Sequence, residues 1–268
     1  MQKISLTGVP ETMLWPLWNR AFESARDRPL IYDPWSEELV ITLDYNFRES
    51  FGRPSRVHGI RSRYGDDLLK SYLKKKHKNA CVIALGEGLE TQFWRLNKPD
   101  VPWYSIDLPE SIDARQRLLP TAENLNYIKC SALDTDWFEA IPDNTIPFIS
   151  AMGLFMYFTE GEVVSLLSSI SKRFPGAELY FDAIPPHFSK KTLNGFHVTK
   201  SYVAPPMPWG ISRADVRDFI KNVPNMELLS VKTYSDPYPE AIRLFHWLSK
   251  INWIVERFAP LLIHTRIK

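Results

Sequence analysis

The sequence predicts an α/β fold of the Rossmann-like type, with a mostly parallel sheet and a helical cap at the N-terminal end. Two observations lead to this prediction. From Cys81 onward, short apolar runs alternate with segments of helical periodicity, which is typical of parallel sheets. The first run ends in a turn that contains Gly86 and Gly88, and such turns let the backbone bend sharply and approach a ligand.

The N-terminal part of the chain, residues 1–78, predicts several helices. Leu14, Leu17, Trp18, Ala21 and Phe22 recur at helical spacing, and a second set of the same kind occupies residues 68–73. The basic run over residues 74–78 is expected to end a helix and to stay solvated, because cations are favourable near a helix C-terminus.

Five apolar runs predict the first five strands of the sheet. They are CVIALG from Cys81, WYSIDL from Trp103, NYIKCSA from Asn126, IPFISAMG from Ile146 and ELYFDAI from Glu178. Their nearly continuous apolar character is expected of strands that are covered on both faces. The glycine turn after the first of these runs then lies at the carboxyl end of a strand.

After residue 212 the pattern predicts a helix over 213–222, a strand over 228–234, a long helix over 240–258 and a last strand in the run PLLIHTRI. These two late strands would complete a seven-stranded sheet. The proline-rich stretches after residue 184 are typical of loops, so we expect a lid-like insertion at about 185–212. We expect a single domain over 1–268, with the cap at 1–78 and the core at 79–268.

Composition restricts the class of protein. The 33 Lys and Arg against 31 Asp and Glu leave a net charge of +2, which gives no overall field for attracting nucleic acid or a membrane. Cys81 and Cys130 form neither a disulfide framework nor a metal site. No apolar stretch approaches the roughly 20 residues of a membrane helix. We expect a soluble, cytoplasmic protein without a metal, acting on a small molecule; the sequence gives no oligomeric state.

The glycine turn and a later acidic residue together predict a nucleoside-binding site. Asp107 ends the second apolar run, 21 positions after Gly86, where a carboxylate can accept hydrogen bonds from both ribose hydroxyls of an adenosine. The alternative is an ordinary strand-to-helix turn, with Asp107 as a helix cap before Pro109. Thr91 stands at the third glycine position of the nicotinamide fingerprint, which argues against a dehydrogenase.

At this point the sequence resembles the leucine carboxyl methyltransferase family, in particular its bacterial branch of polyketide O-methyltransferases of the tetracenomycin type. The resemblance spans most of the chain and rests on an ordered set of motifs: the opening segment from Thr12 to Asp33-Pro34, Arg61-Ser62-Arg63-Tyr64-Gly65-Asp66, the loop from Leu85 to Thr91, Ile106-Asp107-Leu108-Pro109 and Gly153-Leu154-Phe155-Met156-Tyr157-Phe158.

The resemblance implies a class I methyltransferase fold that binds S-adenosylmethionine. It implies that Arg61 holds the methionine carboxylate, a role that suits the two parallel donors of a guanidinium. It implies further that the cofactor's methionine part lies over the glycine loop and that its ribose is bound by Asp107. The remaining expected cofactor contacts within these motifs are Gly86, Glu87, Gly88 and Leu108. Arg20 is expected to share the carboxylate, the alternative for both arginines being a surface position or an ion pair with neighbours such as Asp66 or Asp67.

Three positions depart from the family pattern. Ser131, followed by Ala132, stands where the family carries an Asp that faces the adenine amino group, and both residues are expected near the adenine. Met152 replaces a Glu at the floor of the cofactor site, which exchanges a polar contact for an apolar one. Glu90 replaces an Asp of the glycine loop and keeps its charge.

Methyl transfer is a direct displacement, so the protein has to align the acceptor and exclude water, and a general base is optional. Candidate bases are His187 and His197, which follow the fifth strand, and Tyr157 follows the fourth. The alternatives are loop histidines and a core tyrosine. An aromatic set after residue 187, including Phe188 and Met207, is expected either to roof an apolar acceptor or to pack against the N-terminal helices.

The sequence therefore favours an S-adenosylmethionine-dependent O-methyltransferase that acts on a hydroxyl or carboxyl group of a small molecule, with secondary metabolism of the polyketide type as the expected context. Two alternatives remain open. One is a methyltransferase of protein C-terminal carboxyl groups, and the other is a module that binds the cofactor without catalysis. Function depends on the site and not on the scaffold, so the acceptor stays unidentified.

Overall fold

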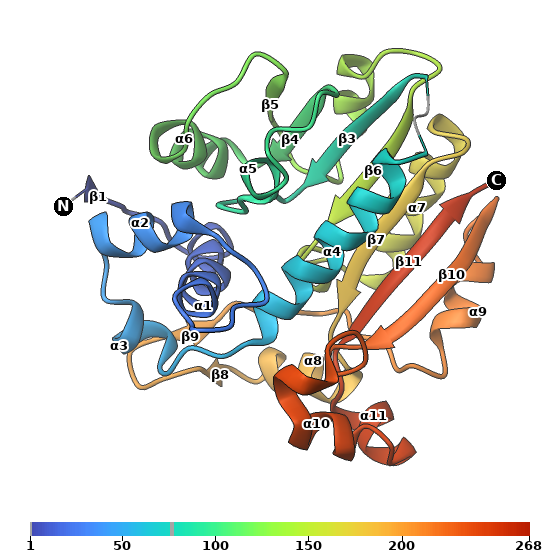
Figure 1. Ribbon diagram of the computed structural model, residues 1–268. Coiled ribbons are helices and arrows are strands. Elements are labelled where there is room, and N and C mark those ends of the chain that lie inside the picture. The colour runs from blue at the N-terminus through green and yellow to red at the C-terminus, as the bar shows by residue number, and fades with distance from the viewer. Residues whose placement is uncertain (1, 76–77) are drawn as a thin grey trace.

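A computed structural model describes residues 2–75 and 78–268 of the chain. Lys76 and His77, which belong to the basic run, lie outside the described residues. The centre of the protein is a seven-stranded sheet (Figure 1) with the order β10-β11-β7-β6-β3-β4-β5. Its strands are β3 (Ala80–Leu85), β4 (Trp103–Asp107), β5 (Leu125–Lys129), β6 (Ile146–Ala151), β7 (Glu178–Ala183), β10 (Met226–Thr233) and β11 (Leu261–Ile267).

The sheet is parallel except at its last strand. β11 is inserted between β7 and β10 and is antiparallel to both, with Leu261 opposite Ala183 on one side and opposite Thr233 on the other. The other neighbouring pairs are parallel. The predicted mostly parallel seven-stranded α/β fold is therefore confirmed, and each predicted strand agrees with an observed one to within about three residues.

The helices and the short strands surround this sheet. The helices are α1 (Leu14–Ser24), α2 (Pro34–Thr42), α3 (Phe47–Phe51), α4 (Val57–Leu73), α5 (Gln92–Arg95), α6 (Pro109–Leu118), α7 (Glu160–Arg173), α8 (Pro186–Leu193), α9 (Val216–Lys221), α10 (Arg243–Leu248) and α11 (Asn252–Phe258). Short 3-10 helices are η1 (Pro10–Met13), η2 (Thr135–Ala140), η3 (Phe155–Tyr157) and η4 (Pro239–Ile242). Two-residue strands are β1 (Gln2–Lys3), β2 (Leu43–Asp44), β8 (Phe196–His197) and β9 (Val203–Ala204).

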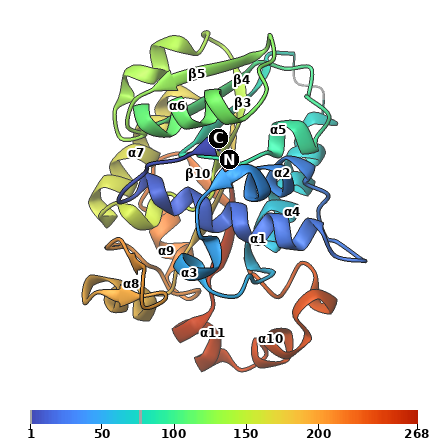
Figure 2. The ribbon, with the colours of Figure 1, turned by 90° about the vertical axis from the view of Figure 1, so that its left-hand side faces the viewer.

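Both faces of the sheet are covered, and the residues of one strand alternate between the two layers. Val82 and Ala84 of β3 pack in the layer that contains α1 and α4, whereas Cys81, Ile83 and Leu85 pack in the layer that contains α7 and α9. Figure 2 shows α4 and α7 on opposite sides of the sheet. Because both faces are buried, the strands carry apolar residues at consecutive positions, which explains the unbroken apolar runs of the sequence.

Two sequence predictions need correction. The segment expected as loops after residue 184 contains helix α8, because Pro186 occupies its first helical position, where a missing N–H costs nothing. The long helix expected over 240–258 is divided into η4, α10 and α11, since Ile251 is extended (φ −98°, ψ 104°). Of α10 and α11 only Val255 is buried, so little packing holds one continuous helix together. Within the described ranges, no helix is both long and apolar enough to cross a membrane.

A buried network of ion pairs joins the N-terminal helices to the core. Arg20 of α1 lies 3.0 Å from Asp33, the N-cap of α2, and 3.3 Å from Glu90 after β3. Arg95 of α5 contacts Glu90 and Asp33 and donates two hydrogen bonds of 2.9 Å to Asp66 of α4. Although burial opposes ionisation, Arg20 and Arg95 hold the pKa of Glu90 well below its usual range. The position of the glycine loop therefore depends on these charges.

The network yields a prediction for stability. Arg95→Met leaves three buried carboxylates without this partner and is expected to lower the free energy of unfolding by about 3–5 kcal/mol. Arg63→Met is the matched control, because Arg63 pairs with Asp67 at a site where both side chains are about two-fifths exposed, and its loss should cost less than about 1 kcal/mol. Urea unfolding followed by circular dichroism measures both; equal losses would contradict the role of the network.

A second prediction concerns pH. Burial by itself raises the pKa of Glu178 on β7, but hydrogen bonds from His264 and Lys75 lower it to about 2. A carboxyl whose pKa is lower in the folded state stabilises the protein above its unfolded pKa of about 4.3, and that stabilisation is lost as the pH falls toward the folded pKa.

The difference in unfolding free energy between wild type and Glu178→Gln should therefore be largest above about pH 5 and shrink as the pH falls toward about 2. Urea unfolding over this pH range measures it. A difference that does not change with pH would show that the Glu178 charge contributes nothing.

Candidate functional site

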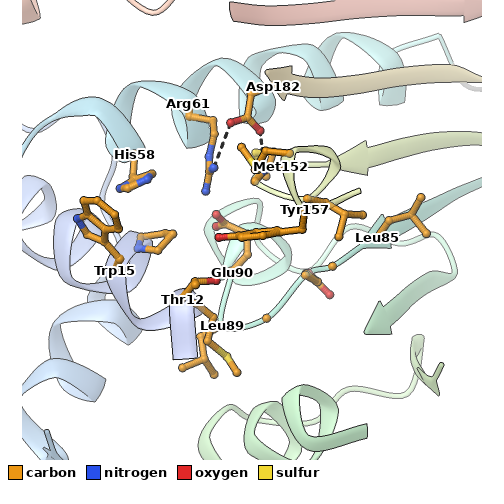
Figure 3. A pocket seen from close by; sticks show the side chains of 18 of the residues that line it. Thr12, Trp15, His58, Arg61, Leu85, Leu89, Glu90, Met152, Tyr157 and Asp182 are labelled. Atoms are coloured by element: carbon orange, nitrogen blue, oxygen red, sulfur yellow. Dashed lines mark hydrogen bonds and ion pairs between the residues drawn. The ribbon is translucent and has the colours of Figure 1, made fainter. Parts of the chain in front are cut away.

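A cavity of about 290 Å³ opens at the carboxyl ends of β3, β4, β6 and β7, close to the lower limit of about 300 Å³ for small-molecule sites. The glycine loop after β3 forms one side of it, and α4 with the segment η1–α1 forms another. Figure 3 shows Arg61 projecting from α4 toward Tyr157 and Glu90, with His58 of the same helix beside Trp15. This is the edge at which ligands bind in open parallel α/β sheets.

The glycine loop has a backbone that other residues do not fit. Gly86 and Gly88 both have positive φ, +59° and +49°. A Cβ at Gly86 would lie 2.7 Å from Cδ1 of Leu154, and one at Gly88 would lie 2.9 Å from Cβ of Met13. The loop therefore needs glycine both for its conformation and for the close approach of its neighbours.

Asp107 closes the same loop from the end of β4. Its carboxylate accepts hydrogen bonds of 2.7 Å from the N–H groups of Gly88 and Leu108. Asp107 and Leu108 both line the cavity. Burial raises the pKa of Asp107, and the two backbone donors oppose that shift. Each carboxylate oxygen keeps further acceptor capacity beyond these bonds.

Arg61 is held in the cavity wall by Asp182 at the end of β7, 3.3 Å away. Asp182 also accepts a 2.5 Å hydrogen bond from the N–H of Gly153 and a 2.7 Å bond from the hydroxyl of Tyr234. The alternative from the sequence was an ion pair of Arg61 with a neighbour such as Asp66. In the structure Asp66 pairs with Arg95 instead. The Nε of Arg61 is buried and has no hydrogen-bond partner among the described residues. One donor of this guanidinium is thus left for a ligand.

Two further charged residues of the cavity wall belong to buried pairs. Arg20 is 1% exposed and donates a 2.6 Å hydrogen bond to the carbonyl of Leu89, in addition to its ion pairs, so the alternative of a surface position is wrong. Glu87 lies 2.8 Å from Arg115 and accepts a 3.3 Å hydrogen bond from Trp103. Burial raises the pKa of Glu87 to about 7, although Arg115 acts in the opposite direction.

The remaining predicted site residues fall into two groups. Met152 and Tyr157 line the cavity. Ser131 and Ala132 are not part of the cavity wall: Ala132 packs in the core, and the Ser131 hydroxyl accepts from the N–H of Leu133.

His187 and His197 lie outside the cavity wall and are exposed. The reason is the unexpected helix α8. Its face toward the cavity presents Phe188, while His187 packs edge-on against Phe258 of α11, with ring centroids 5.4 Å apart. His197 is in the short strand β8. Neither His187 nor His197 is therefore placed to act as a general base in this cavity.

The sequence interpretation missed His58, which lines the cavity one turn before Arg61 on α4. Its ring is oriented by Asn19 of α1. The N–H of Ser55 donates to Oδ1 of Asn19 (3.0 Å), so the amide nitrogen of Asn19 faces Nδ1 of His58, 2.6 Å away. Because an amide nitrogen only donates, Nδ1 accepts and the ring proton is on Nε2.

Burial and the charges of Arg61 and Arg20 lower the pKa of His58 well below its usual range, so the ring is neutral at neutral pH. The spacing of His58 and Arg61 on one helix face was the sequence signal for this residue. Asp182 was also missed, and its signal was an acidic residue at the carboxyl end of a predicted strand.

Beyond Tyr157 the cavity wall becomes apolar. Ile184 after β7, Phe188 of α8 and Met207 line this part together with Met156 and Pro260. The cavity therefore has a polar part at the glycine loop and Arg61 and an apolar part beside α8.

Comparison with known proteins agrees with this architecture. A family model described as leucine carboxyl methyltransferase matches residues 14–171. The chain is 32% identical over 188 residues to the tetracenomycin polyketide synthesis O-methyltransferase TcmP of Streptomyces glaucescens, which covers 69% of each chain. It is 27% identical over 202 residues, 68% of each chain, to the S-adenosyl-L-methionine-dependent methyltransferase dpfgK of Gibberella zeae.

Among solved structures, the magnesium protoporphyrin IX methyltransferase ChlM of Synechocystis PCC 6803 superposes with a TM-score of 0.51 at 8% identity, over 97% of this chain and 98% of that one. At this identity the superposition shows the fold alone, which is that of class I methyltransferases. The matched family model and the bacterial relative confirm the resemblance seen in the sequence. The chain belongs to the leucine carboxyl methyltransferase family and is an S-adenosylmethionine-dependent methyltransferase.

Proposed function

We propose that this chain transfers the methyl group of S-adenosylmethionine to an oxygen atom of a small, largely apolar acceptor. The observation that carries the proposal is a single cavity in which a polar part, formed by the glycine loop, Asp107 and Arg61, is continuous with an apolar part beside α8. The first part suits the cofactor and the second suits the acceptor. The name of the Streptomyces relative supports an acceptor of the polyketide type.

The residues of the polar part fit the cofactor. We propose that Arg61 binds the methionine carboxylate, because its buried Nε is otherwise without a partner in the described chain. The free acceptor capacity of Asp107 suits two ribose hydroxyls. We assign the adenine to Leu108 and Ser111, which line the cavity near Asp107. When bound, the cofactor supplies a methyl group on a positively charged sulfur.

The protonation states of His58 and Tyr157, two side chains of the cavity wall, support an acceptor that needs neither of them as a general base. His58 is neutral and presents an N–H at Nε2, because Nδ1 is occupied by Asn19. Burial raises the pKa of Tyr157, so its hydroxyl stays protonated. Both groups are donors at neutral pH and neither is free to take a proton. An acceptor that arrives ionised, such as a carboxylate or an acidic phenol, fits donors of this kind.

The acceptor class is tested by incubating the protein with S-adenosylmethionine labelled in the methyl group and a panel of aromatic and aliphatic acids, phenols and a peptide that ends in leucine. Methyl esters release methanol in mild alkali, whereas phenol ethers do not. Transfer to a small acid or phenol supports the proposal. Transfer to the peptide alone would favour a protein carboxyl methyltransferase, and binding without transfer to any acceptor would favour a silent module.

For the cofactor we predict that Asp107→Ala weakens binding of S-adenosylhomocysteine by about 10- to 100-fold, since two hydrogen bonds to a charged group are lost. Isothermal titration calorimetry measures the dissociation constant. Asp113→Ala is the control, because Asp113 is an exposed residue of α6 that pairs with Lys129. Thermal unfolding shows whether the Asp107 variant keeps its fold, and unchanged affinity in a folded variant would contradict the assignment.

For the acceptor we predict that His58→Ala raises KM for the acceptor about 10-fold, because a donor to an ionised oxygen is removed. The affinity for S-adenosylhomocysteine should stay unchanged. His58→Gln keeps a donor and is expected to recover part of the loss. If His58→Ala weakened binding of S-adenosylhomocysteine to the same degree, His58 would belong to the cofactor part of the cavity.

A further inference from the structure

Large apolar side chains are concentrated on the outer surface of α8, α10 and α11. Six of the eleven exposed large hydrophobic residues of the described chain lie there, four of them more than 60% exposed: Leu193, Leu244, Phe245, Trp247, Trp253 and Phe258. Figure 1 shows these three helices near one another at one end of the molecule, and Figure 2 shows α10 and α11 side by side there. We call this surface the α8–α11 face. Large apolar side chains that are exposed on neighbouring helices often mark an interaction site.

The charges on the same face are nearly all positive. The exposed cations of α8, α10, α11 and the turn between the last two are Lys190, Lys191, Arg243, Lys250 and Arg257. Glu256 is the one acidic residue within these helices, and its carboxylate accepts a 3.0 Å hydrogen bond from the N–H of Ala214 at the surface, so five exposed cations face one carboxylate. The face is therefore strongly basic although the whole chain has a net charge of only +2.

The α8–α11 face is anchored to the wall of the cavity. Phe258 of α11 packs edge-on against His187 of α8 and against Trp253, with centroids 5.4 and 6.4 Å apart. Phe188, the next residue of α8, lines the cavity, as does Pro260, two residues after the end of α11. A partner bound to the α8–α11 face would therefore lie next to the apolar part of the cavity.

We propose that the α8–α11 face binds the surface of an anionic lipid bilayer. Tryptophan and phenylalanine rings beside lysine and arginine are typical of surfaces that bind a bilayer interface, with the rings at the boundary between headgroups and acyl chains and the cations at the headgroups. No helix has to cross the membrane. This binding goes beyond the proposed reaction and does not depend on it.

The charge pattern favours a bilayer over a second copy of the chain. In a two-fold symmetric dimer the same face of both copies meets, so five cations of one copy would come close to five of the other. Like charges in such an interface cost several kcal/mol. An anionic headgroup layer instead matches every exposed cation of the face.

The full chain is tested by sedimentation with vesicles of phosphatidylcholine, with or without phosphatidylglycerol. We expect binding to the anionic vesicles that weakens with salt, and little binding to the neutral ones. Trp247→Glu/Trp253→Glu should abolish it, and Lys250→Glu/Arg257→Glu should weaken it by more than about fivefold at each position, because each change removes a cation and adds an anion. The controls are Ile41→Glu, at a 76% exposed position of α2, and Arg28→Glu, at an exposed cation away from this face.

The folding of each variant is checked by its binding of S-adenosylhomocysteine. Selective binding to anionic vesicles that Trp247→Glu/Trp253→Glu loses, Lys250→Glu/Arg257→Glu weakens and the controls keep supports the proposal. Absence of binding to anionic vesicles, or equal loss in the controls, would overturn it. A third outcome would also overturn the proposal. In it, ultracentrifugation shows a dimer that Trp247→Glu/Trp253→Glu dissociates, and neither the wild type nor any variant binds vesicles.

Discussion

The functional site depends first on the buried ion pairs between the N-terminal helices and the glycine loop. Glu90, within that loop, is bound at once by Arg20 from α1 and by Arg95 from α5, and Asp33 and Asp66 complete the cluster. A buried carboxylate without partners would be costly, so these groups hold each other in place. This arrangement fixes the wall formed by η1 and α1 against Gly88, whose missing side chain leaves the space that Met13 occupies.

A second constraint acts on Arg61. Asp182 sits at the end of β7 and binds the guanidinium, the N–H of Gly153 and the hydroxyl of Tyr234. A Cβ at Gly153 would lie 2.6 Å from Nη1 of Arg61, so the glycine and the arginine need each other at this point. Three segments that are far apart in the chain thereby set the direction of one side chain, and preorganised donors of this kind bind an anionic group without rearranging.

The cavity combines donors with apolar surface, and neither His58 nor Tyr157 offers a free proton acceptor. Asn19 fixes the tautomer of His58, and burial keeps Tyr157 protonated. In a displacement reaction the protein contributes mainly by aligning the acceptor with the methyl group and by excluding water. Methyl transfer depends on these two contributions more than on a general base. The proposed attachment of the α8–α11 face to a bilayer would place the apolar part of the cavity next to a source of apolar molecules.

The sequence by itself determined the sheet, because strands buried on both faces must carry unbroken apolar runs, and it located the glycine loop and Asp107, because a sharp turn and a strand end leave local signals. It also identified the family. Only the tertiary structure decided which charges pair: Arg61 with Asp182 and Arg20 with Asp33 join positions whose separation in sequence contains no contact information. For the same reason the histidine that lines the cavity is His58 and not His187, since the direction of a side chain depends on how its helix packs.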